Sequence, residues 1–393
     1  MMVCLLLYAY CVGVFSSRKI AQACERNLAF IAIGGTERPD FRTISDCRTL
    51  HVDAFRDVFV QVLRIAGEAG MVQLGNSATD GTTIQGNASR HKAMSYGYMR
   101  KEADRLREDL EALVTQAHQQ DVADAAALGS WRGDELPAEL ARRAARLATI
   151  EAAMRRLEAR AKADAEAERQ RLGSPRRGKA PTPVDATPDD KAQTNFTDPE
   201  LPIMRTNNKG WEYCGNAQAR GEAAHQIIVA CDVTAEANDK QQAEPMARLT
   251  GAALGQASMA LPKDATGVAQ EIPAPYDSGY DSAGAAAAVE QLGFEPYMAP
   301  ERRRHHAPET ASPDRLATAK ERMAAKVRTP AGQALYTRRK VIVEPVFGQI
   351  KEARGFCRFL LRGLDNIRGA WRLVCVTHNL LKIWRYACAP LTA

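Results

Sequence analysis

Three acidic residues, far apart in the chain, stand where a strand or a helix could present a carboxylate for chemistry. Asp80 ends a short segment of β-tolerant residues, Asp277 lies where a predicted strand gives way to a helix, and Glu344 lies in a basic helical tract. Two-metal phosphoryl transfer needs carboxylates from separate elements, because divalent ions take hard oxygen ligands and a shared acid holds the two ions about 4 Å apart. Taken singly, an aspartate before a glycine is also a common turn residue.

Glu344 stands among cations. If residues 340–362 are largely helical, one face about 80° wide carries a single acid within a basic stripe, made of Lys340, Glu344, Lys351, Arg354, Arg358 and Arg362. Such a face suits a metal ion and a DNA phosphate together, although a surface of i,i+4 salt bridges would look the same. Pro345 is expected to kink or restart this helix.

The charge of the chain is uneven. The 393 residues carry a formal net charge of +6, but residues 301–393 hold 19 Lys/Arg and 7 Asp/Glu, so the remainder is slightly acidic. A basic C-terminal segment is typical of proteins that bind a polyanion, most often nucleic acid. With 45% hydrophobic and 25% charged residues, the composition excludes collagen-like, wholly disordered and disulfide-framework classes.

Cysteine usage and hydropathy indicate a reducing cytoplasm without membrane attachment. The nine cysteines include no C-x-x-C pair, which argues against a disulfide framework and a thiolate zinc site. No apolar run reaches the roughly 18–20 residues of a membrane span. Residues 1–15 are apolar but lack the features of a signal peptide, so we expect a core helix there.

The sequence divides into four parts. Residues 1–70 are expected to form an N-terminal helical region, residues 71–90 and 196–393 an α/β domain, residues 91–172 an inserted helical hairpin, and residues 173–195 a flexible linker. His378, on an apolar helix, is expected to be structural.

Within the α/β domain, the segments 211–219 and 225–233 predict a β-hairpin. A helix over 238–249, a strand over 271–280, a helix over 282–292 and a strand over 294–298 follow. Asp232 and Asp239 are alternatives to Asp277 as the second acid. The polar run 76–79 and the prolines at 273 and 275 predict that the strands before Asp80 and Asp277 are short or irregular.

Several ordered motifs join these segments. The chain reads T-D-G-T-T-I-Q-G-N-A-S-R-H-K-A-M-S-Y-G over 79–97, T-D-P-E over 197–200, N-A-Q-A over 216–219 and V-A-C-D-V-T-A-E-A-N-D-K-Q-Q over 229–242. It continues with Y-D-S-G-Y over 276–280, Y-T-R-R-K-V-I-V-E-P-V-F-G-Q-I-K over 336–351, R-G-F over 354–356 and T-H-N-L-L over 377–381. Across essentially the whole chain, this pattern resembles the DDE transposases of bacterial insertion sequences, in the branch with a helical insertion after the first Asp.

The resemblance implies an RNase H-like mixed sheet flanked by helices, with an N-terminal helical region and an inserted helical hairpin. It implies that Asp80, Asp277 and Glu344 bind two Mg²⁺ or Mn²⁺ ions. The family's Tyr-Arg-Glu-Lys signature maps onto Tyr336, Arg339, Glu344 and Lys351, with Lys340 sharing the role of the arginine. These basic residues, with Arg354 and Arg358 of the stripe, are then expected to bind DNA.

The implied activity is DNA cleavage and strand transfer at the ends of the element. The implied partners are double-stranded DNA (terminal inverted repeats and target) and further copies of the chain in a synaptic complex, in a cytoplasmic, nucleoid-associated setting. We expect Asp80 and Asp277 on neighbouring strands, with Glu344 on a helix that crosses the sheet. Two other functions stay open: a decayed protein of the same fold that only binds DNA, and a scaffold built on the hairpin of residues 91–172.

Overall fold

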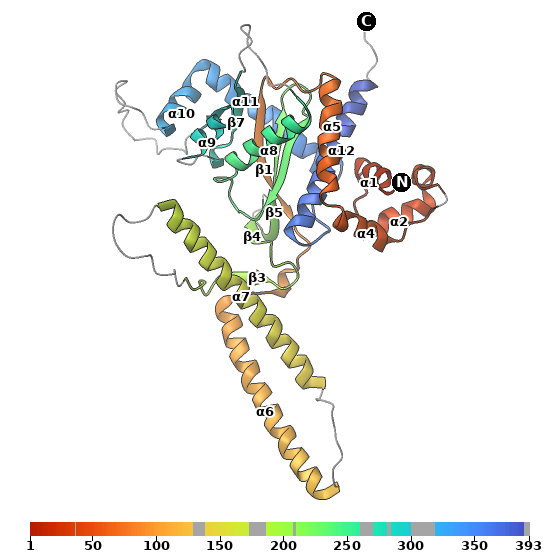
Figure 1. Ribbon diagram of the computed structural model, residues 1–393, viewed down its shortest axis with the longest axis vertical. Helices are drawn as coiled ribbons and strands as arrows, with labels where there is room; N and C mark the ends of the chain where they lie inside the picture. Colours follow the sequence, from red (N-terminus) through yellow and green to blue (C-terminus); the bar gives the residue numbers. More distant parts are fainter. Residues whose placement is uncertain are drawn as a thin grey trace. The chain divides into compact units, whose positions relative to one another are not determined.

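A computed structural model gives the fold of the chain. It describes residues 1–35, 37–128, 138–172, 186–206, 210–259, 270–280, 284–299 and 319–388. The chain forms two compact units, one from Met1–Asn87 with Met204–Ala393 and the other from Ala88–Ile203. The larger unit is a mixed sheet flanked by helices (Figure 1), so the predicted α/β class is confirmed.

The strands, in chain order, are β1 (Ser77–Gln85), β2 (Ala93–Ser95), β3 (Gln193–Asn195), β4 (Ile203–Arg205), β5 (Trp211–Glu222), β6 (Ile228–Thr234), β7 (Ile272–Tyr276) and β8 (Phe294–Met298). In the main sheet β1 is central. β5 pairs with β1 in antiparallel register on one side and β7 pairs with it in parallel on the other. β6 and β4 lie beyond β5, and β8 beyond β7.

The helices are α1 (Met2–Cys11), α2 (Ser17–Arg26), α3 (Leu28–Gly34), α4 (Phe41–Leu50), α5 (Ala54–Glu68), α6 (Tyr96–Leu128), α7 (Ala138–Leu172), α8 (Ala243–Gln256), α9 (Ala285–Gln291), α10 (Ala319–Arg328), α11 (Pro330–Gly348) and α12 (Leu364–Ala387). Short turns of other helix types are η1 (Arg90–Lys92), η2 (Ser278–Tyr280) and the π-helical η3 (Gln349–Ala353). Residues 1–70 contain α1 to α5, α1 buries apolar residues such as Leu5 and Leu6 where a core helix was expected, and β5 and β6 form the expected antiparallel hairpin.

The expectation of short or irregular central strands is wrong for β1, which pairs with β5 at every one of its positions from Ser77 to Gln85. For β7 the register explains how two prolines are tolerated. Successive residues of a strand direct their backbone groups to opposite neighbours, so Pro273 and Pro275 both lack a donor toward the same strand. That strand is β1, whose Ser77 hydroxyl donates to the Pro273 carbonyl. The pairing of β7 with β8 is complete over five residues.

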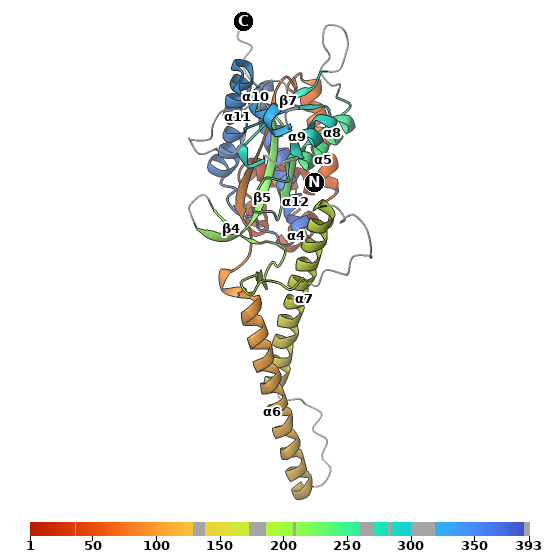
Figure 2. The same ribbon diagram turned by 90° about the vertical axis from the view of Figure 1, so that its left-hand side faces the viewer.

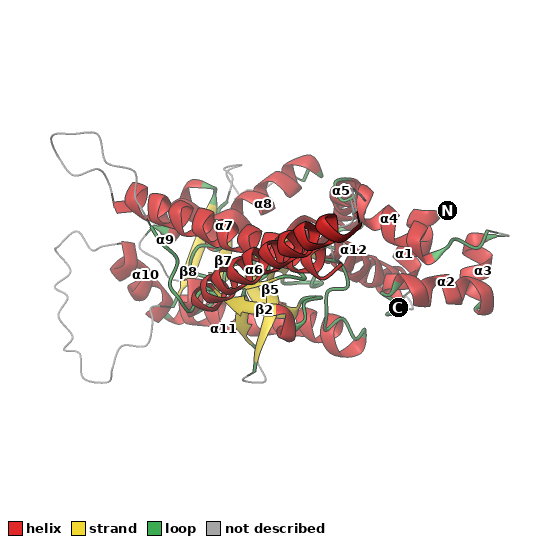
Figure 3. Ribbon diagram, turned by 90° about the horizontal axis from the view of Figure 1, so that it is seen from below, coloured by secondary structure: helices red, strands yellow, loops and turns green. Residues whose placement is uncertain are grey.

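Helices cover both faces of the sheet. Figure 3 shows α11 on one side of the strands and α8 and α9 on the other. Small residues of β5 admit α11, since a Cβ atom on Gly221 would lie 3.4 Å from Ile342. Trp371 of α12 is fully buried, stacks on Phe347 of α11 with centroids 6.4 Å apart, and donates its indole N–H to the backbone of Gln218. This aromatic contact fixes α11 beside α12.

Pro345 does not interrupt α11, contrary to the prediction that it would kink or restart the helix. Proline has no N–H to donate to the carbonyl four residues earlier, which is that of Val341. The side chain of Gln226, from the β5–β6 turn, donates to this carbonyl instead, at 3.2 Å. The same residue also binds Gln349 and Lys382 through its Oε1 atom and His378 through its backbone carbonyl. One turn residue therefore compensates the proline and ties α11, η3 and α12 to the sheet.

The helix predicted to continue to residue 362 ends earlier. Beyond Ala353 the chain leaves helical geometry, Gly355 takes a left-handed φ of +73°, and helix resumes only at Leu364. The predicted stripe of cations is therefore not a helix face beyond η3. In the same way, α8 begins at Ala243 rather than at residue 238, which leaves Asp239 in a loop.

The smaller unit contains the predicted helical hairpin. α6 and α7 run side by side (Figure 2) around an apolar cluster that includes Met99, Leu106 and Ile150. Salt bridges cross between them, such as Arg107 to Glu151 at 2.7 Å. Residues 173–185 of the expected linker lie outside the described residues. Of the helices in the described part of the chain, none is long and apolar enough to cross a membrane.

The buried histidine of α12 should make stability fall in acid. His378 is 2% exposed and its Nε2–H donates to the Gln226 carbonyl at 3.0 Å. Burial lowers its pKa from 6.5 to about 3. Below pH 6.5 the unfolded chain therefore takes up a proton that the folded protein excludes, so the histidine's contribution to stability is present above pH 6.5 and is lost as the pH falls toward 3.

We expect the free energy of unfolding of the wild type, relative to His378→Gln, to fall by about 1.4 kcal/mol between pH 7.5 and 5.5. Urea denaturation of both proteins at the two pH values measures the difference. His51→Gln, at an exposed position, shows what an exposed histidine contributes. A wild-type advantage over His378→Gln that is the same at both pH values would contradict the assignment.

Candidate active site

The first expected acid, Asp80, lies in the middle of the central strand β1. It faces Ala219 of β5, and its Oδ1 accepts the backbone N–H of Gly81 at 2.9 Å. Its side chain is 19% exposed. Burial raises the pKa of this carboxyl from 3.8 to about 6, against the opposing effect of the nearby Arg339 guanidinium. At neutral pH the carboxylate is therefore mainly ionised, although its burial makes the ionised form less favourable than it would be in water.

The second expected acid, Asp277, directly follows β7. Thr79 of β1 is in register with Tyr276 of β7, so the next residue of each strand is one of the two acids. The two aspartates accordingly lie on neighbouring elements of one sheet, as the sequence predicted. The side chain of Asp277 is 45% exposed, and that of Asp80 is much less so.

One guanidinium bridges both acids. Arg339 of α11 places Nη1 3.2 Å from Asp80 Oδ2 and Nη2 3.1 Å from Asp277 Oδ1, and its side chain is 7% exposed. Its guanidinium also lies 5.8 Å from the ring of Tyr336. The family signature predicted that Arg339 binds DNA. In this structure the side chain is turned inward and neutralises the two carboxylates.

The donor atoms of this pair of side chains are of the kind that a divalent cation takes. Two carboxylates converge on one positive group, and carboxylate oxygens are the hard donors that Mg²⁺ and Mn²⁺ take. A positive group between the acids already offsets their mutual repulsion. Asp80 and Asp277 are therefore the residues of this site that could hold a metal ion.

The third expected acid, Glu344, is apart from this pair. It lies five residues after Arg339, which is about 140° around the helix axis at 100° per residue, and its side chain is exposed. Among the residues that the structure describes, no three His, Cys, Asp or Glu side chains are close enough together to hold one ion. The structure thus brings together two of the three expected acids.

The expected DNA-binding cations divide into two groups. Arg354 points into the protein, donating to the Thr377 hydroxyl at 2.8 Å and to the Val374 carbonyl at 3.2 Å, and burial lowers its pKa to about 10. Lys351 is half-buried and donates to Thr82 of β1. The others lie at the surface: Lys340 on the exposed side of α11, and Arg358, which donates to the Gly86 carbonyl.

The two rival aspartates have different surroundings. Asp232 of β6 pairs with Arg368 of α12 at 3.3 Å, and burial raises its pKa. Asp239 lies beside the site, where its Oδ1 accepts hydrogen bonds from Asn216 and Gln218 of β5. Neither amide was predicted as a site residue. The sequence feature that could have pointed to them is the alternation of polar residues at 216, 218, 220 and 222. In the structure this stretch of β5 is fully buried.

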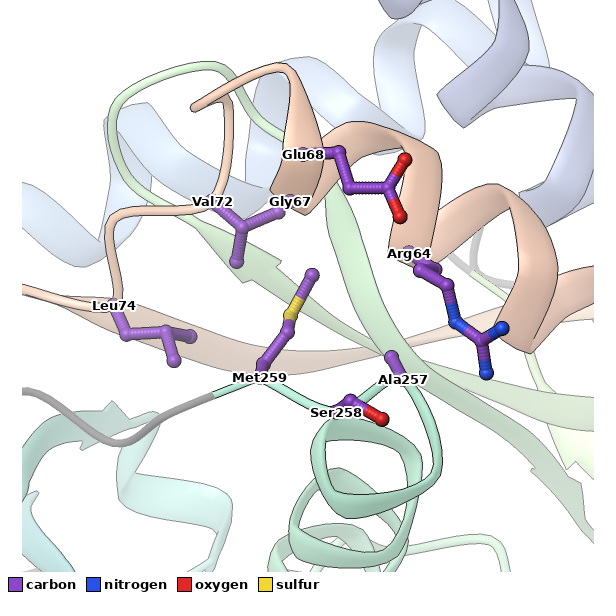
Figure 4. Close-up of a pocket in the computed structure, with 8 residues that line it drawn as sticks. All are labelled: Arg64, Gly67, Glu68, Val72, Leu74, Ala257, Ser258 and Met259. Atoms are coloured by element: carbon purple, nitrogen blue, oxygen red, sulfur yellow. The ribbon is translucent and has the colours of Figure 1, made fainter.

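The cavity drawn in Figure 4 is a separate feature. Its volume is about 510 Å³, and it lies between the end of α5 and the chain after α8, where Met259 points toward Gly67 and Val72. A Cβ atom on Gly67 would overlap the end of the Met259 side chain. None of its lining residues is an expected site residue.

Comparison with protein families finds two matches. Residues 300–384 match the family described as Transposase DDE domain, a span that holds α10, α11, η3 and most of α12 and therefore Arg339, Glu344 and Lys351. Residues 1–50 match the family described as Transposase domain (DUF772), which spans α1 to α4. Comparison with curated proteins and with solved structures finds no match. The two family matches, one toward each end of the chain, indicate a DDE transposase of the bacterial insertion-sequence type.

Proposed function

We propose that this transposase cuts DNA at the ends of its element and joins the cut ends to target DNA, in a metal-dependent reaction centred on Asp80 and Asp277. The observation that carries the proposal is the meeting of these two carboxylates, one within β1 and one directly after the neighbouring β7, around one cationic group. A buried carboxyl with a raised pKa, beside a second acid and an arginine, is typical of a functional site rather than of a surface ion pair.

The strand order supports an RNase H-like core. From one edge the order is β6, β5, β1, β7, β8, with the first three antiparallel in succession and β7 and β8 parallel to β1. The first acid lies on the central strand and the second follows the next parallel strand. This arrangement agrees with the fold that the family resemblance implies.

Asp80 and Asp277 would hold Mg²⁺ or Mn²⁺, and Glu344 is included as a third ligand on the family resemblance alone. Bound there, the metal would supply activation of a water or a terminal 3′-OH and stabilisation of the leaving 3′-oxygen in an in-line displacement. The charge of Arg339 favours the ionised form of Asp80, and the contact of Lys351 with Thr82 holds η3, which directly follows α11, against β1. The partners are then terminal-repeat DNA, target DNA and further copies of the chain in a synaptic complex.

A second function is supported by one observation. Glu344 is exposed and apart from the two aspartates, which is what a decayed copy that only binds DNA would show. The regular pairing of β1 favours an intact site. DNA-cleavage assays of variants at the acidic residues distinguish an active transposase from a protein that only binds DNA.

We expect Asp80→Asn and Asp277→Asn each to lower Mg²⁺-dependent nicking of terminal-repeat DNA by at least about 10³-fold, because an amide is a poor ligand for a hard divalent ion. Glu344→Gln should lose activity to the same extent if Glu344 is the third ligand. Asp365→Asn, at a highly exposed acid on α12, is the control and should cut normally. Wild-type protein that binds the repeats but never nicks them would establish the DNA-binding function instead.

Removal of the bridging cation should destabilise the protein in a way that Mg²⁺ reverses. Arg339→Gln leaves two close carboxylates uncompensated, and we expect a loss of about 2 kcal/mol, reduced from the value for a fully buried pair because Asp277 is half-exposed. Arg338→Gln, at the exposed neighbouring position, should be close to neutral. Thermal denaturation with and without Mg²⁺ measures both. Equal stabilisation of Arg339→Gln and wild type by Mg²⁺ would show that the ion does not bind where the arginine does.

DNA binding should depend on the exposed cations and not on Arg354. Lys340→Ala and Arg358→Ala should each flatten the dependence of log K on log salt by about 0.9 for every phosphate that the protein no longer neutralises. Lys162→Ala, exposed on α7, serves as the charge-matched control. Arg354→Ala should instead lower the melting temperature, because its partners lie within α12. A salt slope unchanged in the Lys340/Arg358 double variant would mean that this surface does not meet DNA.

A further inference from the structure

Asp239, an acid that the two-aspartate centre does not use, touches both segments that carry the centre. A Cβ atom built on Gly81, the residue after Asp80, would lie 2.7 Å from Asp239 Oδ1. A Cβ atom on Gly279, two residues after Asp277, would lie 3.7 Å from Asp239 Oδ2. The carboxylate of Asp239 thus lies between the two segments, and the glycine at 81 is what leaves room for it.

Buried amides hold this carboxylate in place. Its Oδ1 accepts hydrogen bonds from Asn216 Nδ2 at 2.8 Å and from Gln218 Nε2 at 2.6 Å. Gln218 is fully buried, Asn216 is 4% exposed, and the two amides also bond to each other at 3.0 Å. Because both amides come from β5, which is paired with β1 and with β6, these hydrogen bonds tie Asp239 to the sheet.

The network continues to the turn that carries Asp277. The Oε1 atom of Gln218 accepts the phenol hydrogen of Tyr280, a fully buried residue. The backbone N–H of Tyr280 in turn donates to the carbonyl of Asp277 at 3.0 Å. A continuous path of hydrogen bonds therefore runs from Asp239 through Gln218 and Tyr280 to the backbone of the second acid.

We propose that Asp239 is a positioning residue of the transposase site: acting through Gln218 and Tyr280, it fixes the turn of residues 277–280 against β1, so that Asp80 and Asp277 are held at the separation a divalent ion needs. The inference rests on the proposed function. Asp239 acts through its neighbours because one of its oxygens is already occupied by two amides. Outer groups that orient metal ligands in this way commonly change metal affinity 10- to 100-fold when they are removed.

The test is Mn²⁺ affinity, measured by calorimetry on the full chain. Asp239→Ala and Gln218→Leu should each weaken Mn²⁺ binding by about tenfold, and the double variant should be no weaker than either, because the two act as one unit. Asp239→Asn keeps the oxygen that accepts both amides, so its affinity should stay within about threefold of the wild type, whereas Asp80→Asn should bind no ion at this site.

Gly81→Ala disturbs the same network without replacing Asp239, because its Cβ atom would overlap the Gln218 amide nitrogen. It should also weaken Mn²⁺ binding. Gly251→Ala, on α8 with no atom within 4 Å of the added Cβ, is the matched control and should bind as the wild type does. If Asp239→Ala fails to fold, Gly81→Ala and Asp239→Asn still carry the test.

Two results would overturn the inference. Loss of Mn²⁺ binding in Asp239→Asn as complete as in Asp80→Asn would make Asp239 a direct ligand, and wild-type affinity in Asp239→Ala would leave it without a role. A wild-type protein that binds no Mn²⁺ would contradict the proposed function itself. In that case the positioning role is tested without metal, by amide hydrogen exchange at residues 277–280. The exchange should be faster in Asp239→Ala than in Asp239→Asn, and equal rates would contradict the positioning role.

Discussion

A single guanidinium placed between two carboxylates joins the parts of the larger unit on which its chemistry would depend. Through Arg339, the central strand β1, the turn after β7 and helix α11 share one charged contact in a largely buried setting. Two ionised aspartates at such short range would repel each other if no cation lay between them. The position of α11 along the sheet is therefore set near its middle by charge. In its C-terminal half it is set by the aromatic contact of Phe347 with Trp371 and by the hydrogen bond from Gln226 to Val341.

How much of this site could be predicted depends on the kind of sequence pattern that pointed to each residue. The placement of the two aspartates at adjacent strands followed from the family resemblance. The residues around Asp80 suggested the end of a strand, whereas Asp80 lies within β1, because the pairing with β5 continues to Gln85. The inward direction of Arg339 could not be predicted, because the spacing of a helix gives the face of a residue but not which neighbour that face meets. Arg354 was assigned to DNA on the assumption of an unbroken helix, whereas the π-helical turn and the left-handed Gly355 turn its side chain toward Thr377.

Strand β5 shows a second limit of sequence reasoning. Asn216, Gln218, Arg220 and Glu222 alternate with small residues, a pattern that usually marks one solvated face. Here every one of these side chains is buried. Arg220 is fully buried against Ser77, Tyr276 and the ring of Phe294. The polar face of this strand is directed into the protein because it supports the two acid-bearing segments, and buried polar groups that are hydrogen-bonded give a rigid support.

The insertion of the helical hairpin between β1 and its partner β5 has a consequence for the timing of synthesis. Asp80 and the arginine that neutralises it are 259 residues apart in the chain. At the usual 5–20 residues per second, a ribosome needs roughly 10 to 50 s between making one and making the other. During that interval the nascent chain holds the first acid without its cation and without the helix that carries it. An unfinished or prematurely terminated polypeptide therefore lacks an assembled centre, and any power to break DNA would arise only when translation is nearly complete.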